Sequence, residues 1–238
     1  MSEVRQRALI IVPTYNERGN VEEVVKHFLP PLAGGELLFV DDNSPDGTGE
    51  VLDRLAAADP RVHVMHRPGK LGLGTAYLDG FRWGLARGFD YLFEMDADFS
   101  HDPKYLAGML AKAQAGADVV VGSRYVEGGG TENWGLQRKL ISRGGSLYAR
   151  TILGVKLRDV TAGFICYRRS ALETIDLGAI TSNGYSFQIE MKYRALKAGL
   201  TVVETPIVFV DRRIGQSKMS RKIFVEAMSK VWKLRLGK

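Results

Sequence analysis

Two aspartates, Asp96 and Asp98, directly follow an apolar segment of strand length at residues 91–95. In an extended chain, side chains two residues apart point to the same side, so the two carboxylates would be neighbours. Neighbouring carboxylates repel each other unless a cation is held beside them. A hard ion such as Mg²⁺ takes one or two carboxylates and completes its shell with phosphate oxygens. The pair therefore predicts a metal–diphosphate site, although loop acids or a helix cap would also explain this triplet taken alone.

The elements that would position this pair alternate between strand and helix patterns. Short Val/Ile/Leu runs predict strands at 8–12, 37–40, 62–65, 91–95 and 119–122, and amphipathic stretches predict helices at 21–29, 49–58, 75–87 and 105–115. Continuous apolar strands between helices are typical of a mostly parallel sheet covered on both faces. We therefore expect an α/β fold with a Rossmann-like sheet, in a single domain spanning residues 1–238.

Polar clusters follow three of the expected strands, at residues 13–17, 41–48 and 96–98. Ligands of parallel sheets bind at the carboxyl ends of the strands. Three strands that deliver polar groups to one edge are harder to attribute to chance than one acidic pair. Within the second cluster, Ser-Pro-Asp-Gly-Thr is good turn chemistry, so we expect Asp46 to cap the next helix and Asp42 to bind a ligand.

Several nucleotide-binding and hydrolase motifs are absent. The first strand ends without the Gly-x-Gly-x-x-Gly of dinucleotide-binding domains, and the Gly-x-Gly at 72–74 follows a later strand and lacks the third glycine. The chain has neither a P-loop nor a Gly-x-Ser-x-Gly elbow. NAD binding, P-loop chemistry and an α/β-hydrolase mechanism are therefore not expected.

Composition indicates a basic protein of a reducing compartment. The net charge is +6, and residues 212–238 hold nine Lys/Arg and one acid, Glu226, which suggests an anionic partner or a solvated face. The single cysteine, Cys166, excludes an intrachain disulfide and has apolar flanks that favour a buried thiol. The first residues are too charged for a signal peptide, and no apolar run is long enough for a membrane span.

These motifs together resemble the family 2 glycosyltransferases of the GT-A fold, and most closely their polyprenol-phosphate (dolichyl-phosphate) mannose synthase branch. The residues that carry the resemblance are 12–17, 40–48, 95–101, 122–125, 138–144, 184–191 and 212–218. The first and third of these blocks are shared across the wider superfamily, whereas the fourth to seventh are more specific to the branch. The resemblance extends over nearly the whole chain.

The resemblance implies a role for each block. It assigns the nucleotide sugar to Pro13, Tyr15, Glu17, Val40, Asp42, Asp96, Ala97, Asp98, Arg124, Arg212 and Lys218. It places Mg²⁺ or Mn²⁺ on Asp96, Asp98 and Ser100, and the acceptor phosphate on Arg124, Arg138, Ser142 and Arg143. Asp98 and Arg124 are the expected catalytic residues. For Arg138 and Arg143, a basic face of a helix at 136–153 is the alternative reading.

The implied reaction is transfer of mannose, with inversion, from GDP-mannose to a polyprenyl or dolichyl monophosphate. An acceptor that is already an anion needs no strong base, and the chain lacks the Glu-Asp and Gln-x-x-Arg-Trp motifs of enzymes that glycosylate a hydroxyl. A polyprenyl-phosphate glucosyl or aminosugar synthase that uses a UDP-sugar is the alternative within this class. A basic nucleic-acid-binding domain is disfavoured, because acids at strand ends would repel phosphates and no aromatic stripe appears. A non-catalytic nucleotide-binding partner is disfavoured by the intact acids and arginines.

The C-terminal segment is expected to form an amphipathic helix at about 221–236. Its apolar stripe comprises Ile223, Phe224, Ala227, Met228, Val231 and Trp232, with basic residues beside it. The stripe could dock the enzyme on a membrane or pack on the enzyme's own core. The expected location is cytoplasmic, peripheral at the cytoplasmic face of a membrane, and a membrane-anchoring partner subunit remains an open alternative.

Overall fold

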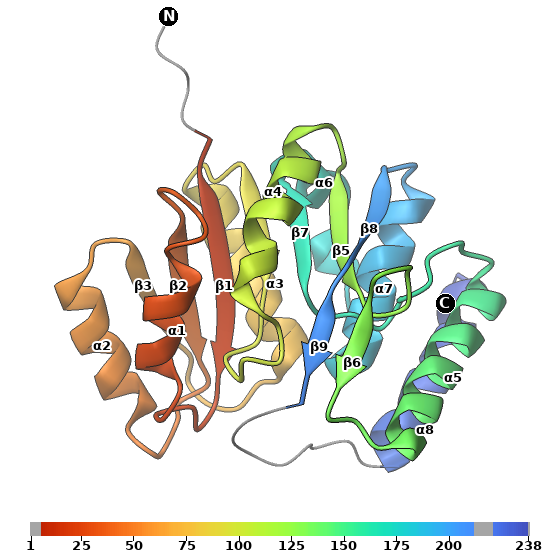
Figure 1. Cartoon of the computed structure of the whole chain (residues 1–238), viewed down its shortest axis with the longest axis horizontal. Helices are drawn as coiled ribbons and strands as arrows, with labels where there is room; N and C mark the ends of the chain where they lie inside the picture. The colour runs from red at the N-terminus through yellow and green to blue at the C-terminus, as the bar shows by residue number, and fades with distance from the viewer. Residues whose placement is uncertain (1–5, 212–220, 238) are drawn as a thin grey trace, which may run out of the picture.

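The computed structural model describes residues 6–211 and 221–237, with side chains for all of these except 221–227. A seven-stranded sheet with the order β3-β2-β1-β4-β7-β5-β8 runs through the molecule (Figure 1). Its strands are β1 (Ala8–Thr14), β2 (Glu36–Asp41), β3 (Val62–His66), β4 (Tyr91–Glu94), β5 (Val119–Ser123), β7 (Ile165–Arg168) and β8 (Val202–Pro206). All neighbouring pairs are parallel except those of β7, which is antiparallel to both β4 and β5.

Alternation along the strands divides the core into two layers. Ile10 and Val12 of β1 pack on the face covered by α1 (Val21–Phe28), α2 (Thr48–Ala58) and α4 (Leu106–Gln114). Leu9 and Ile11 pack on the opposite face, which is covered by α3 (Leu73–Ala86), α6 (Arg169–Thr174) and α7 (Gly184–Lys197). Because successive strand side chains point to opposite faces, one apolar strand contributes to both layers.

A third apolar cluster lies outside these layers. Helix α5 (Leu136–Leu153) and helix α8 (Arg221–Arg235) lie side by side at one end of the molecule and pack against α7 (Figure 1). A small parallel sheet of β6 (Gly130–Glu132) and β9 (Val208–Val210) lies between them and the main sheet, and short 3₁₀ turns occupy Pro103–Tyr105 and Leu177–Ala179. Among the residues described, no helix combines the length and apolar character that crossing a bilayer requires.

The expected strands and helices up to residue 123 are all present, with ends that differ by a few residues. The expected helix at 105–115 begins with a 3₁₀ turn, and the helix at 136–153 is present over its full length. The N-cap of α2 is Gly47, and Asp46, one residue earlier, accepts hydrogen bonds from the amide and hydroxyl of Thr48, the first residue of the helix; the expected contact with the helix start is present, one position before the cap. Cys166 is buried in β7, and its burial raises the pKa of the thiol.

The C-terminal helix is confirmed, and its described part packs on the protein itself. Val231 and Leu234 are buried against α5 and α7, and Tyr148 donates to the main-chain oxygen of Met228. Trp232 remains 51% exposed. The side chains of Ile223, Phe224 and Ala227 lie outside the described residues. Val231 and Leu234 therefore follow the expectation that the apolar stripe packs on the enzyme's own core.

Helix α3 approaches the sheet closely at a glycine. A Cβ on Gly80 would lie 2.5 Å from Cγ2 of Ile11, a β-branched residue in the central strand β1. We expect Gly80→Ala to lower the free energy of unfolding by about 1–3 kcal/mol, because neither the strand nor the helix can yield without disturbing the core.

Gly108 in α4 is a matched control, because no atom of the described residues lies within 4 Å of the position its Cβ would take. There the same substitution should stabilise the protein by about 0.4–1 kcal/mol, since alanine restricts the unfolded chain. Urea denaturation measures both variants. Equal effects at the two sites would contradict the close approach of α3.

Candidate active site

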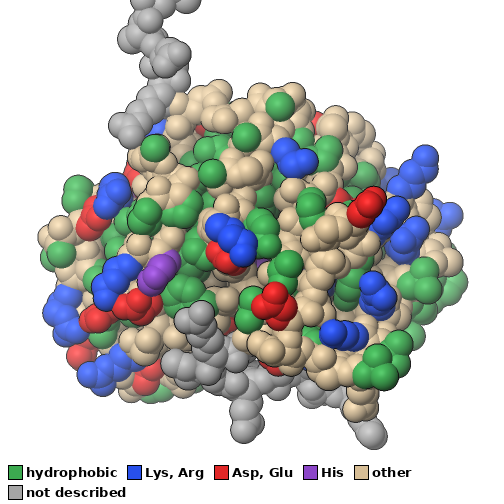
Figure 2. Space-filling view, viewed as in Figure 1, with side chains coloured by type: hydrophobic (Ala, Val, Ile, Leu, Met, Phe, Trp, Pro, Cys, Tyr) green, Lys and Arg blue, Asp and Glu red, His purple; other side chains and the backbone are tan. Residues whose placement is uncertain are grey.

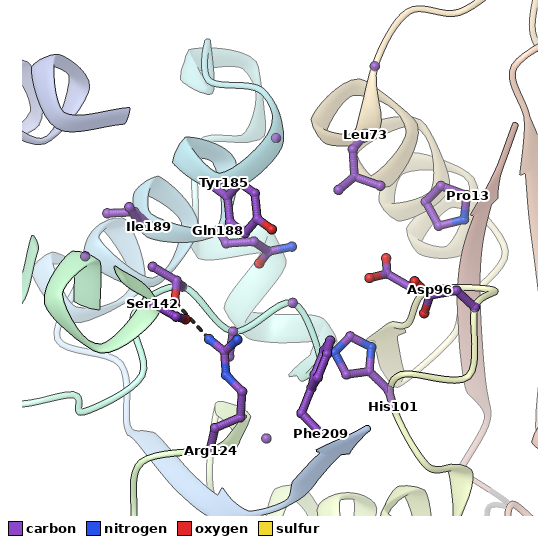
Figure 3. Close-up of a pocket in the computed structure, with 18 of the residues that line it drawn as sticks. Pro13, Leu73, Asp96, His101, Arg124, Ser142, Tyr185, Gln188, Ile189 and Phe209 are labelled. Carbon is purple, nitrogen blue, oxygen red and sulfur yellow. Dashed lines mark hydrogen bonds between the residues drawn. The ribbon is translucent and has the colours of Figure 1, made fainter. Parts of the chain in front are cut away.

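A cavity of about 590 Å³ opens at the carboxyl ends of the parallel strands. Most of the residues that the sequence assigned to binding line it: Pro13, Tyr15, Glu17, Asp42, Asp96, Ala97, Asp98, Arg124, Arg138 and Ser142. In Figure 3, Asp96 and Pro13 lie on one side of the cavity, and Arg124 and Ser142 lie on the other. The cavity thus has an acidic wall and a basic wall that face each other.

The acidic wall is built by the turn that follows β4. Phe99 adopts a left-handed conformation with φ of 59°, which is uncommon for a residue with a side chain and reverses the chain after Asp98. The amide and hydroxyl of Ser100 both donate to Oδ1 of Asp98, at 3.1 and 2.5 Å. Ser100 is buried and is not among the residues that line the cavity; its contacts orient Asp98, and its role as a metal ligand stays a prediction.

A tyrosine holds the other carboxylate. The hydroxyl of Tyr77 donates to Oδ1 of Asp96 at 3.3 Å. Burial, followed by the charge of Asp96, raises the pKa of Tyr77, so this hydroxyl stays protonated and remains a donor. Within the described residues no cluster of three or more His, Cys, Asp or Glu forms a metal cage. Two carboxylates that leave the other positions to phosphate oxygens and water suit Mg²⁺ or Mn²⁺.

Hydrogen bonds join the loops that follow β1 and β2. The amide of Asn16 donates to Ser44 Oγ, and the amide of Glu17 donates to Thr48 Oγ1, both at 3.0 Å. Buried Asp41 accepts from the hydroxyls of Thr14 and Ser44. The expected nucleotide-binding loop, residues 13–17, is therefore held by the neighbouring loop before any ligand binds.

Asp42 has a structural role that the sequence did not indicate. Its carboxylate forms an ion pair with the guanidinium of buried Arg67 and accepts the amides of Leu71 and Gly72. These contacts fix the loop that carries Lys70, whose ammonium lies 4.0 Å from the centre of the Tyr15 ring. Asp42 still lines the cavity, beside Lys70 and Tyr15.

Val40 differs from the expectation. Its side chain is fully buried in the layer covered by α3 and does not line the cavity, because the sheet alternation turns it into the core. Any contact of Val40 with a nucleotide would have to come from its main chain.

The basic wall centres on Arg124, which is buried and paired with an acid. Asp159 accepts three hydrogen bonds from Arg124, at 3.0 Å from the amide and 2.7 Å from each of Nε and Nη2. Burial alone would raise the pKa of Asp159, but the charge and hydrogen bonds of Arg124 outweigh it and hold the pKa below its ordinary value. The ion pair fixes the Arg124 guanidinium, which points into the cavity (Figure 3).

The remaining residues that were expected to bind the acceptor phosphate come from α5. Arg138 donates to Asp211 at 2.7 Å and stacks over Trp134, so its charge is partly compensated. Ser142 and Tyr125 share a hydrogen bond of 2.6 Å. Arg143 is exposed and lines an adjoining cavity of about 320 Å³ together with Arg124 and Lys139. Arg212 and Lys218, expected to clamp the diphosphate, lie outside the described residues.

A buried polar network lies beneath the cavity, and sequence inspection missed it. Gln188 of α7 donates from Nε2 to Oε2 of Glu94 at 2.5 Å, and Lys192 Nζ donates to the carbonyls of Ala162 and Gln188. Burial raises the pKa of Glu94 to about 8 and lowers that of Lys192 to about 8. The positive charge of Lys192 acts against the first shift, and the negative charge of Glu94 acts against the second. In the sequence, this network is indicated by Glu94, a glutamate within an otherwise apolar strand.

Breaking the Arg124–Asp159 pair should be costly. We expect Asp159→Asn to lower the free energy of unfolding at pH 7 by about 3–5 kcal/mol, because a buried guanidinium loses its counter-charge. The exposed pair of Asp59 and Arg61 is the control, and Asp59→Asn should cost at most about 1 kcal/mol.

The contribution of the Arg124–Asp159 pair to the free energy of unfolding should depend on pH. The pKa of Asp159 is lowered in the folded protein, so its stabilisation is complete above the unfolded value of about 3.9 and is lost as the pH falls through the folded value. The difference between wild type and Asp159→Asn in urea denaturation should therefore shrink as the pH is taken from 7 to below 4. A difference that does not change with pH would refute the charged pair.

The chain is similar to known proteins over most of its length. The model of glycosyl transferase family 2 matches residues 9–176. The chain is 52% identical to polyprenol monophosphomannose synthase of Mycolicibacterium smegmatis, over 97% of this chain and 88% of that protein. It is 51% identical to undecaprenyl-phosphate mannosyltransferase of Micrococcus luteus, over 94% of this chain and 92% of that protein.

Solved structures share the fold. Glucosyl-3-phosphoglycerate synthase from Mycobacterium tuberculosis, in complex with Mn²⁺, UDP and its glucosylated product, superposes with a TM-score of 0.70 at 18% identity, covering 98% of this chain and 81% of that one. The same enzyme with Mg²⁺ and UDP gives 0.70 at 16% identity, covering 98% and 80%. The chain belongs to glycosyltransferase family 2, has the GT-A fold and is a glycosyltransferase.

Proposed function

We propose that the enzyme transfers mannose from GDP-mannose to a polyprenyl monophosphate, with inversion at the anomeric carbon. The single observation that carries the proposal is the opposition of the Asp96/Asp98 wall and the Arg124/Ser142 wall across one cavity. A nucleotide diphosphate and a phosphate acceptor are both anions, and the two walls provide separate places for them. The names of the two relatives above support mannose as the sugar and a polyprenyl phosphate as the acceptor.

The residues divide the chemistry between them. Asp96 and Asp98 would hold a divalent ion, which supplies charge neutralisation at the diphosphate as GDP leaves. Arg124 and Ser142 orient the acceptor phosphate, one of whose oxygens attacks the anomeric carbon while the bond to the β-phosphate oxygen of GDP breaks. The attacking oxygen is already ionised, so no side chain has to remove a proton from it.

The part of the cavity lined by the loop after β1 is the proposed site for the nucleoside. Pro13, Tyr15 and Glu17 lie there on the loop held by Ser44 and Thr48.

A UDP-sugar remains the alternative donor. Incubating the purified protein with labelled GDP-mannose, Mg²⁺ and a short polyprenyl phosphate, followed by solvent extraction, should move label into the lipid phase. A panel that gives more lipid-linked label from UDP-glucose would overturn the choice of donor.

Activity should depend on the carboxylate of Asp98. Asp98→Asn keeps the shape and the contact with Ser100 but removes one charge from the cation site. We expect kcat/KM to fall by roughly 100-fold or more, with the metal-dependent part of GDP-mannose binding lost and stability retained.

Asp102→Asn is the matched control, because Asp102 caps the 3₁₀ turn at Pro103–Tyr105 and does not line the cavity. It should retain activity. Initial rates and binding titrations with and without EDTA measure the effect. Full turnover by Asp98→Asn, or by wild type in excess chelator, would show that the acids hold no catalytic metal.

A polyprenyl acceptor would require a membrane-facing surface, and α5 has the features of one. Leu136, Leu140 and Leu147 are 73%, 63% and 59% exposed and recur on one helix face. Arg143 and Arg150 lie beside this face at helical spacing, and α5 contains no acid. Figure 2 shows hydrophobic side chains next to Lys and Arg at this end of the molecule. Ser142 and Tyr148 of the same helix line the cavity.

This arrangement moves the proposed docking surface from the C-terminal helix to α5; Trp232 of α8 and Leu236, which follows α8, are also exposed. The leucines would insert at the headgroup boundary, and each nearby cation adds about 1 kcal/mol on an anionic surface. An enzyme bound in this way would present its acceptor wall to the bilayer.

Vesicles with about 30% anionic lipid present a negatively charged surface. Replacing Leu136, Leu140 and Leu147 by serine should weaken binding to such vesicles by roughly tenfold or more. Turnover of a short, water-soluble acceptor should be unchanged, since none of the three lines the cavity. Leu71→Ser is the control, because Leu71 is 50% exposed on a loop far from α5 in sequence. Vesicle co-sedimentation measures the binding. Equal loss with Leu71→Ser, or no loss with the triple variant, would place membrane contact elsewhere.

A further inference from the structure

Gln188 is among the side chains that line the cavity and carry a buried polar atom without a hydrogen-bond partner in the described part of the chain. Gln188 of α7 is 4% exposed, lines the cavity and points into the space between Asp96 and Arg124 (Figure 3). Its Nε2 donates to Glu94, whereas its Oε1 is buried and accepts no hydrogen bond from any of the residues that the structure describes. A buried acceptor left unsatisfied is unfavourable, so such an atom in a binding cavity points to a ligand group.

The orientation of this amide follows from the residue behind it. Glu94 is fully buried at the end of β4, and a carboxyl group keeps an acceptor oxygen for Nε2 whether or not it carries a proton. Lys192 lies in the same network through the main-chain oxygen of Gln188. With Nε2 directed to Glu94, the planar amide has to direct Oε1 away from Glu94.

The location identifies the kind of ligand. Under the proposed function, the diphosphate lies at Asp96 and Asp98 and the acceptor phosphate at Arg124 and Ser142, so the sugar occupies the gap between them. Gln188 presents an uncharged acceptor to that gap, which suits a hydroxyl group and repels a phosphate oxygen. We infer that Gln188 is a specificity-determining residue whose Oε1 accepts a hydrogen bond from one hydroxyl of the transferred sugar.

This inference rests on the proposed function, and it differs from a purely structural role for Gln188. Phe187, the neighbour of Gln188, stacks on Tyr77 with ring centres 6.0 Å apart, and Tyr77 in turn donates to Asp96. A structural role would therefore disturb Asp96 and weaken the binding of GDP itself. A contact with a sugar hydroxyl would leave GDP binding intact and affect only donors that carry that hydroxyl.

The test measures equilibrium binding of GDP, GDP-mannose and its monodeoxy and deoxyfluoro analogues in Mg²⁺ without acceptor. For wild type, removal of one particular hydroxyl should weaken binding roughly tenfold, because Oε1 is again left unsatisfied. The fluoro analogue at that position should bind equally weakly, since fluorine cannot donate to Oε1. Gln188→Met should bind GDP-mannose roughly tenfold more weakly and no longer distinguish it from that deoxy analogue, while GDP affinity stays unchanged.

Two further variants complete the test. Gln188→Asn withdraws the amide by one carbon and should behave like Gln188→Met, and it carries the test if the methionine variant does not fold. Gln114→Met makes the same chemical change on an exposed residue of α4 and should retain wild-type discrimination.

The possible failures are distinguishable. If wild type binds GDP-mannose no better than other nucleotide sugars, the proposed donor is wrong. If wild type prefers GDP-mannose but the Gln188 variants keep the deoxy penalty, or lose GDP affinity equally, only the inference about Gln188 is overturned.

Discussion

The site depends on the requirement that a charge removed from water must find a partner. Asp41, Asp42 and Asp159 are all buried, and each is satisfied by donors from another segment of the chain. Asp41 joins the loops after β1 and β2, Asp42 fixes the loop that carries Lys70, and Asp159 fixes Arg124. The polar edge of the sheet is therefore held rigidly by its own ion pairs and hydrogen bonds. Donors and acceptors prepared in this way need little reorganisation when an anionic ligand arrives.

The two walls of the cavity belong to different parts of the fold. The acidic wall follows β4 in the centre of the sheet, whereas the basic wall combines Arg124, which follows β5, with α5, which packs in the separate cluster with α8 and α7. Contacts connect the two parts: Arg138 of α5 pairs with Asp211 after β9, and Trp134 packs edge-on against Phe209 of β9. Asp211 directly precedes the segment that contains Arg212. Helix α5, which we propose binds the acceptor, thus contacts the residue next to Arg212, which we propose binds the donor.

The C-terminal part of the chain shows how an amphipathic pattern is shared between two surfaces. Val231 and Leu234 are buried on α5 and α7, while Trp232 of the same helix stays exposed. Packing α8 on α5 leaves the outward face of α5 uncovered. A helix that lines the cavity on one side and exposes leucines on the other can connect the acceptor site to an apolar phase.

The sequence by itself determined the elements up to β5 and the edge at which the polar clusters meet, because both follow from local patterns: apolar runs, helical spacing, and polar residues directly after strands. It also indicated Asp96, Asp98, Arg124 and the helix at 136–153 through motifs that are contiguous in the chain. Tertiary structure alone decided that β7 inserts antiparallel between β4 and β5 and that the side chain of Val40 faces the core. It alone paired Arg124 with Asp159, 35 residues away, and Glu94 with Gln188, 94 residues away. Such contacts join segments that are distant in the chain, and no local periodicity records which buried charge meets which donor.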